Sequence, residues 1–240
     1  MALLEVRNIS KTFRGLRAVA EVSFDVPEGG IVALIGPNGA GKTTCFNMIA
    51  GSFRPDGGTV TLAGRRIDGL RQDQICHAGI GRTFQIVRPF AQLTVEENVI
   101  VGALNATGSV SVARGEARRA LDMVGLGPKA GQMAASLTLP ERKRLEIARA
   151  MATHPRILLL DEVMAGLRPL ETDQMVQVFR TLNRETDLTI LLIEHVMRAV
   201  MALAGHVIVL NHGETICAGP PEQVVRDPAV LECYLGEEAL

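Results

Sequence analysis

The chain has 240 residues, 47% of them hydrophobic, and a formal net charge of -1 at pH 7. A chain of this length can bury the core of one large α/β domain, with or without a small subdomain. The nearly balanced charge argues against a broad nucleic-acid-binding surface. The four cysteines include no Cys-x-x-Cys pair, so neither a zinc site nor a disulfide framework is indicated, and a reducing cytoplasm is the expected compartment.

The first third of the chain predicts strands separated by glycine and proline turns, namely "LLEVRNI", "VSFDV", "IVALIG" and "GTVTLAG". The first of them alternates polar and apolar residues, and we interpret it as an edge strand rather than a secretory signal. No apolar run reaches the roughly 18 residues of a membrane-spanning helix. We therefore do not expect this chain to cross a bilayer by itself.

Three apolar runs without alternation predict central strands, namely "IVALI", "RILLLD" and "LTILLIEH". Such runs are typical of parallel strands that are covered on both faces. Helical periodicity follows each run, so a strand-helix-strand unit recurs.

From about residue 86 to residue 153, helical patterns replace the strand signals and predict an inserted helical subdomain. The last of these helices begins within "SLTLPE". There, Thr138 and Glu141 have the spacing of a capping box, and Pro140 suits the first turn. The tail of the chain predicts two short helices that begin at proline.

The segment "GPNGAGKTT", residues 36–44, matches the phosphate-binding pattern Gly-x-x-x-x-Gly-Lys-[Ser/Thr] between a buried strand and a helix. Backbone N–H groups of such a loop surround a phosphate at the helix N-terminus, and glycines permit the close approach. Lys42 would neutralise the β- and γ-phosphates, and Thr43 would offer a hydroxyl to Mg²⁺. The alternative is a glycine-rich turn with an exposed lysine.

Two carboxylates, Asp161 and Glu162, end the second apolar run. If this strand lies beside the first, Asp161 emerges where magnesium would sit, and Glu162 could polarise a water in line with the γ-phosphate. The alternative is that both residues only cap the next turn. His195 has the equivalent position on the third run and could hydrogen-bond the γ-phosphate, although most lone histidines are structural. Gln85 follows a short apolar strand and could reach the metal or the water.

Together, "GPNGAGKTT", "RTFQ", "LEIARAMATHPRILLLDE" and "LLIEH" have the order and spacing of the ATPase subunits of ABC transporters. The resemblance covers essentially the whole chain. "GIGRTFQIVRPFAQLTVEENV" and "AGLRP" resemble most the ATP-binding subunits of branched-chain amino-acid importers. The resemblance implies an ABC ATPase fold over residues 1–240. This is an α/β P-loop NTPase core with a mixed or parallel sheet, an N-terminal antiparallel β-subdomain and the helical insertion at 86–153.

The resemblance also implies a role for each site residue. Phe13 would stack on adenine, although it could equally be an ordinary loop aromatic. Gln85 would be the Q-loop residue, Asp161 the metal-side carboxylate, Glu162 the general base and His195 the switch histidine. The Walker A residues that would bind ATP are Gly36, Asn38, Gly39, Ala40, Gly41, Lys42, Thr43 and Thr44. Mg²⁺ would be held by Thr43, Gln85 and Asp161.

The segment "LTLPE", residues 137–141, departs from the Leu-Ser-Gly-Gly-Gln signature of this family. Leucine and proline replace both glycines, which removes an N–H donor and hinders close approach of the backbone. Glu141 brings an anion near a phosphate unless a cation such as Arg142 or Lys143 intervenes. A second departure is Arg168, where many relatives have Asp or Asn. Either this signature still supports turnover, or the chain works beside a different ATPase subunit that has a better one.

The resemblance implies a cytoplasmic ATPase, peripheral on the inner face of the membrane, that uses ATP and Mg²⁺. Its partners would be transmembrane permease subunits, a second identical or different ATPase subunit and, indirectly, an extracytoplasmic solute-binding protein, but no nucleic acid. The permease would dock on the segment after Gln85, and the solute would be a branched-chain amino acid or a related small molecule. Two alternative functions are considered. The chain could be a soluble ABC-type ATPase that acts on nucleic acid or the ribosome, or a nucleotide-gated module with weak hydrolysis.

Overall fold

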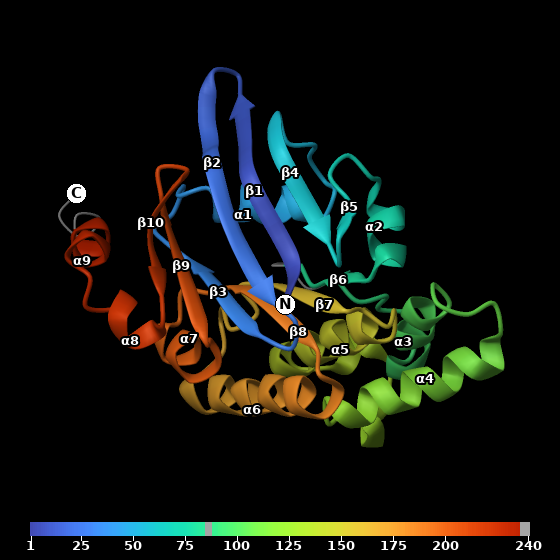
Figure 1. Cartoon of the computed structure of the whole chain (residues 1–240). Helices are drawn as coiled ribbons and strands as arrows, with labels where there is room; N and C mark the ends of the chain where they lie inside the picture. The colour runs from blue at the N-terminus through green and yellow to red at the C-terminus, as the bar shows by residue number, and fades with distance from the viewer. Residues whose placement is uncertain (85–87, 236–240) are drawn as a thin grey trace.

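The computed structural model of the chain describes residues 1–84 and 88–235 (Figure 1). Two β-sheets and their helices form the molecule, and each face of the larger sheet is covered. One core cluster joins this sheet to α1 (Lys42–Ile49) and the smaller sheet, and the other joins it to the long helices below it in Figure 1. None of the described helices is both long and apolar enough to cross a membrane.

The larger sheet has six strands in the order β10-β9-β3-β8-β7-β6. All neighbouring pairs are parallel except β9 with β10, so the sheet is mixed. Its strands are β3 (Ile31–Ile35), β6 (Ile80–Arg82), β7 (Ile157–Asp161), β8 (Thr189–Ile193), β9 (His206–Asn211) and β10 (Glu214–Gly219). The three apolar runs of the sequence are β3, β7 and β8, which lie side by side with helices or the other sheet on both faces.

The smaller sheet is antiparallel and has the order β2-β1-β4-β5. Its strands are β1 (Ala2–Phe13), β2 (Leu16–Pro27), β4 (Gly57–Leu62) and β5 (Arg65–Arg66). The prediction that the N-terminal strand is an edge strand is wrong, because β1 pairs with both β2 and β4. Alternation along a strand indicates that one face is buried, but it does not indicate how many strands lie beside it.

Between β6 and β7, the described residues form helices and a single isolated bridge, Thr94 to Met133. The helices are α3 (Val95–Ala103), α4 (Val110–Met123), two 3-10 turns (Gly127–Lys129 and Ala134–Ser136) and α5 (Leu139–Met151). Elsewhere lie α2 (Gln72–Ala78), α6 (Pro169–Thr186), α7 (Met197–Leu203), α8 (Pro221–Val224) and α9 (Pro228–Leu235). The two proline-started helices of the tail are confirmed.

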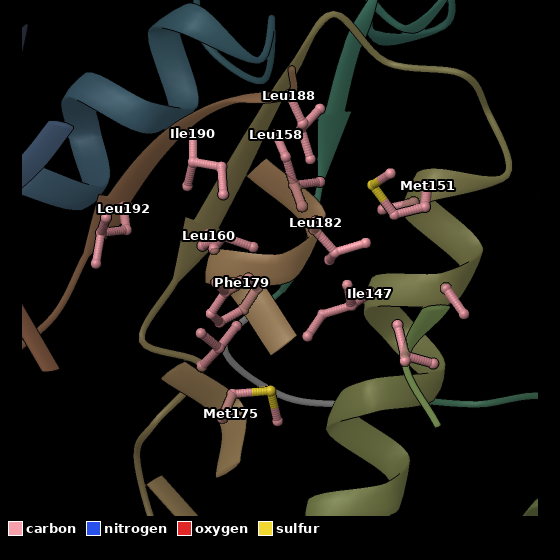
Figure 2. Close-up of a cluster of buried hydrophobic side chains, with 14 of the residues drawn as sticks. Ile147, Met151, Leu158, Leu160, Met175, Phe179, Leu182, Leu188, Ile190 and Leu192 are labelled. Atoms are coloured by element: carbon pink, nitrogen blue, oxygen red, sulfur yellow. The ribbon is translucent and has the colours of Figure 1, made fainter. Parts of the chain in front are cut away.

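A buried cluster joins α5 to the sheet (Figure 2). Met175, Phe179 and Leu182 of α6 lie between α5 and the strands β7 and β8, and Phe179 is fully buried. The predicted capping box at the start of α5 is confirmed, since the N–H of Thr138 donates to Glu141 Oε2 at 3.0 Å. The orientation of the helix that follows the altered signature is therefore determined both by its cap and by its packing.

Candidate active site

The phosphate loop lies between β3 and α1, and its glycines are required by close approach of the backbone. A Cβ on Gly36 would lie 2.0 Å from the carbonyl oxygen of Leu210, and one on Gly41 would lie 2.5 Å from that of Ala18. Both glycines have positive φ angles, 145° and 99°. Any side chain at either position would displace the loop, so the loop geometry depends on glycine.

Lys42 at the start of α1 is 5% exposed. Its Nζ donates to the carbonyl oxygens of Gly36 and Pro37 at 2.7 and 2.8 Å. The ammonium group is thus folded back over the loop, unlike the exposed lysine of the alternative interpretation. Asn38 and Thr43 on the same loop are exposed. A loop at a helix N-terminus with a cation folded back over it suits the phosphates of a nucleotide.

The carboxyl ends of three adjacent strands meet beside this loop. In register, Leu34 of β3 lies opposite Ile193 of β8, and Ile193 lies opposite Asp161 of β7. The strand with the two carboxylates is therefore not directly beside β3, because β8 lies between them. The three strand ends still share one edge, which is where ligands bind in open α/β sheets.

Asp161 is 3% exposed and faces Arg82 of β6, whose Nη2 lies 3.2 Å from Oδ2. Burial raises the pKa of this carboxyl, and the positive charge of Arg82 opposes the rise. Asp161 and Thr43 line the same cavity, which has a volume of about 740 Å³. A carboxylate and a hydroxyl are oxygen ligands, so this pair fits a Mg²⁺ ion that also binds phosphate oxygens.

Glu162 follows Asp161 and faces His195. His195 Nε2 lies 3.1 Å from Glu162 Oε1. The backbone of Glu162 has a φ of 51°, and its N–H donates to the carbonyl oxygen of Ile193 at 2.9 Å. The side chain thus points toward the neighbouring strand end, which does not fit the alternative that it only caps the next turn.

The sequence analysis did not assign Glu194 to this site, and it named Lys143 only as a possible partner of Glu141. Glu194 is 1% exposed and Lys143 of α5 is 4% exposed. Burial raises the pKa of Glu194 to about 7 and lowers the pKa of Lys143. A signal for Lys143 was present, because it lies one helical turn before Ile147 on the apolar face of α5, where a charge is unusual.

Phe13 lies at the tip of the β1–β2 hairpin and pairs with Leu16. Ala18 and Val19 of the same hairpin contact Gly41, so Phe13 is at the loop end of the sheet. Phe13 is 37% exposed, and its ring makes an edge contact with Phe53, with centroids 5.2 Å apart. Gln85 lies outside the described residues.

The cation beside Glu141 is Lys129, not Arg142 or Lys143. Lys129 Nζ lies 2.5 Å from Glu141 Oε1, and this hydrogen bond lowers the pKa of the carboxyl. Arg142 instead donates to backbone carbonyl oxygens, including that of Leu137 at 2.8 Å. Lys143 turns toward the core. The residue that neutralises Glu141 is distant in sequence, so only the tertiary structure could identify it.

Arg168, the second departure from the family pattern, stands at the N-cap of α6. Its side chain is 83% exposed and forms an ion pair with Glu171, one turn into the helix. The N–H of Arg168 also donates to Glu171 at 2.9 Å. The contacts that Arg168 makes therefore stabilise the N-terminus of α6.

Glu146 in the cavity wall predicts a pH dependence of stability. It is 8% exposed, accepts the N–H of Phe84 at 3.2 Å, and burial raises its pKa from 4.5 to about 7. Between these values the folded chain binds the proton more tightly than the unfolded chain, so stability is lost as the pH rises toward 7. Between pH 5 and pH 8, the melting temperature of Glu146→Gln should change less than that of the wild type, by on the order of 5 °C. Equal pH profiles in thermal melts would contradict this assignment.

Comparison with known proteins agrees with this geometry. A family model described as ABC transporter matches residues 19–165, and one described as Branched-chain amino acid ATP-binding cassette transporter matches residues 214–239. The high-affinity branched-chain amino acid transport ATP-binding protein LivG of Salmonella typhimurium is 43% identical over 98% of both chains. The corresponding protein BraF of Pseudomonas aeruginosa is 41% identical with the same coverage.

Solved structures agree as well. A nucleotide-free ATP-binding cassette from an ABC transporter matches with a TM-score of 0.89 and 30% identity over 98% of this chain and 99% of that one. The ADP conformation of MJ1267, an ATP-binding cassette of an ABC transporter, gives the same values. The chain therefore belongs to the ABC transporter family, as an ATP-binding cassette that hydrolyses ATP.

Proposed function

We propose that the chain is the ATP-binding subunit of an importer for branched-chain amino acids. The convergence of Lys42, Asp161, Glu162 and His195 on one edge of the sheet carries the ATPase part of this proposal. The solute is supported by the match of residues 214–239 to a branched-chain amino acid family and by the printed functions of LivG and BraF.

In this proposal the loop 36–44 binds the phosphates, with Lys42 as the charged group and Phe13 stacked on the adenine. Thr43 and Asp161, together with Gln85, hold Mg²⁺, which when bound neutralises charge on the β- and γ-phosphates. In this structure Arg82 forms an ion pair with Asp161, which compensates the negative charge of the buried carboxylate.

Glu162 acts as the general base that accepts a proton from the attacking water. A carboxylate can do this only if it is aimed at the water, and a base held in position contributes several orders of magnitude to the rate. His195 holds the Glu162 carboxylate through the 3.1 Å contact. In the complex with ATP, His195 would also hydrogen-bond the γ-phosphate.

The permease docks on the part of this cavity that α3 and α5 line, whereas Thr43 and Asp161 line the part that we assign to Mg²⁺. Phe84, Arg88 and Val101 line this cavity, and Phe84 and Val101 are exposed apolar residues. Phe90 beside them is also exposed and packs under Arg149 at 4.8 Å. This surface borders the segment after Gln85 and suits a short apolar helix. It would hold the chain at the cytoplasmic face of the membrane, with a second ATPase subunit beside it.

Transport assays test the solute. The chain would be reconstituted in proteoliposomes with the permease and ATPase subunits that copurify with it and with the solute-binding protein. We expect ATP-dependent uptake of labelled leucine. Uptake of a labelled amide or of urea in place of leucine would contradict the branched-chain assignment, while leaving the ATPase assignment intact.

The altered signature predicts slow hydrolysis by the isolated chain, because the native partner supplies a better signature. Glu141→Gln should raise this rate several-fold, since it removes an anion near the γ-phosphate. Glutamine can still accept the N–H of Thr138, so the helix cap is kept, and loss of the partly exposed ion pair with Lys129 should lower the melting temperature only slightly. The measurement is steady-state ATPase activity of the purified chain. If the isolated wild type hydrolyses ATP at the full rate and Glu141→Gln does not change that rate, the altered signature does not weaken hydrolysis.

A further inference from the structure

We propose that Glu194 is a positioning residue for ATP hydrolysis, because its buried side chain holds the backbone turn that carries Glu162. Lys143 completes this arrangement by connecting the same turn to α5, the helix that follows the signature. The proposal rests on the role of Glu162 as the base.

The backbone of Glu162 needs to be held. Its φ of 51° lies in the left-handed region, which costs a residue other than glycine on the order of 1 kcal/mol. Such a conformation persists only where the surroundings impose it. Here the chain continues directly into a turn in which the N–H of Ala165 donates to the carbonyl oxygen of Glu162 at 3.2 Å.

Three consecutive residues at the end of β8 hold this turn. The carbonyl oxygen of Ile193 accepts the N–H of Glu162 at 2.9 Å, and Glu194 Oε1 accepts the N–H of Met164 at 2.8 Å. His195 then contacts the Glu162 carboxylate itself. Glu162 is thus held by contacts to its own N–H, to the N–H of Met164 that follows it in the turn, and to its carboxylate. Of these contacts, the one from Glu194 is made by a side chain that is 1% exposed and that the hydrolysis scheme does not otherwise use.

Lys143 approaches the same turn from α5. Its Nζ lies 3.5 Å from the carbonyl oxygen of Glu162, and it is attracted by the charges of Glu194, Glu146 and Glu162. Because α5 begins at the altered signature, a displacement of this helix would act on the turn through Lys143. A buried lysine here also supplies the positive charge that Glu194 needs in an apolar surrounding.

Removing the Glu194 carboxylate has a specific consequence. Met164 is 1% exposed, so in Glu194→Ala its N–H would be buried without this acceptor. The turn would relax, and Glu162 would lose its aim at the water. The loop that holds Lys42 lies on β3 and α1, so nucleotide binding would be retained.

The experiment compares Glu194→Ala, Glu194→Gln and the control Asp68→Asn. Asp68 is also a carboxylate whose side chain is largely buried, accepts a backbone N–H (that of Val60 at 3.0 Å) and faces a cation, but it lies in the turn after β5, beside the smaller sheet. We expect Glu194→Ala to lower kcat by about 10-fold or more, with KM and the affinity for a fluorescent ATP analogue changed by less than about twofold. Glu194→Gln should recover most of kcat, because its amide oxygen can accept the same N–H. The control should keep kcat.

An unchanged kcat in Glu194→Ala, or an equal loss in Glu194→Gln, would overturn the proposal, and so would a parallel loss of ATP affinity. If Glu194→Ala does not fold, Lys143→Met is measured in its place. We expect this variant to have a lowered kcat and to keep its affinity for ATP. An unchanged kcat would contradict the proposal. Glu162→Gln is measured alongside. Normal hydrolysis there would refute the base assignment, whereas a loss there with normal kcat in Glu194→Ala would refute only the role of Glu194.

Discussion

Glu162→Gln is expected to lower ATP hydrolysis by about 1,000-fold and to leave ATP binding intact. The amide has nearly the shape of the carboxylate, so it can keep the contact with His195, but it cannot accept a proton from water. ATP would then remain bound, and the dimer that we propose with a second ATPase subunit would stay closed. The measurements are steady-state hydrolysis and the size of the complex in ATP by gel filtration.

The matched control for this substitution is Glu185→Gln, which removes a carboxylate from the exposed C-terminal turn of α6. It should hydrolyse ATP at the wild-type rate. Normal hydrolysis in Glu162→Gln would remove Glu162 from the role of base. In that case the 3.1 Å contact between Glu162 and His195 would be structural.

Lys42→Ala is expected to weaken ATP binding by about 100-fold or more, because a charge-assisted contact to two phosphates is lost from a buried position. The same change also removes the hydrogen bonds from Nζ to the carbonyl oxygens of Gly36 and Pro37. Binding of a fluorescent ATP analogue measures the effect directly, without hydrolysis.

Arg184→Ala is the control for the loss of a positive charge, since the Arg184 side chain is 78% exposed near the C-terminus of α6. It should bind the analogue as the wild type does. If Lys42→Ala also kept its affinity, the loop 36–44 would not be the phosphate site, and the ATP-binding part of the proposal would fail.

The local features of this chain could be predicted because each depends on neighbours in sequence. The phosphate loop has its glycines and lysine at set spacings, and the apolar runs around it identify the central strands. The cap of α5 depends on Thr138 and Glu141, three residues apart, and the structure confirms it. The carboxylates and the histidine stand at strand ends, and parallel strands bring their ends to one edge.

The order of the strands, in contrast, was decided by packing across the whole sheet. Hydrophobic periodicity does not indicate whether β7 or β8 lies beside β3. The alternation of residues in β1 likewise did not indicate that β1 also pairs with β4. The roles of Phe13 and Gln85 remain predictions, since the first rests on an exposed ring and the second lies outside the described residues.

The amino-acid sequence alone predicted which groups would bind a triphosphate, because loop spacing, caps and strand ends depend on residues close along the chain. The pairing of charges from distant segments became visible only in the folded chain. Lys129 faces Glu141, Arg82 faces Asp161, and Lys143 and Glu194 meet at the turn of Glu162. For the buried carboxylates Asp161 and Glu194 the physical reason is that a buried charge needs a partner, and the fold brings that partner from a distant part of the chain.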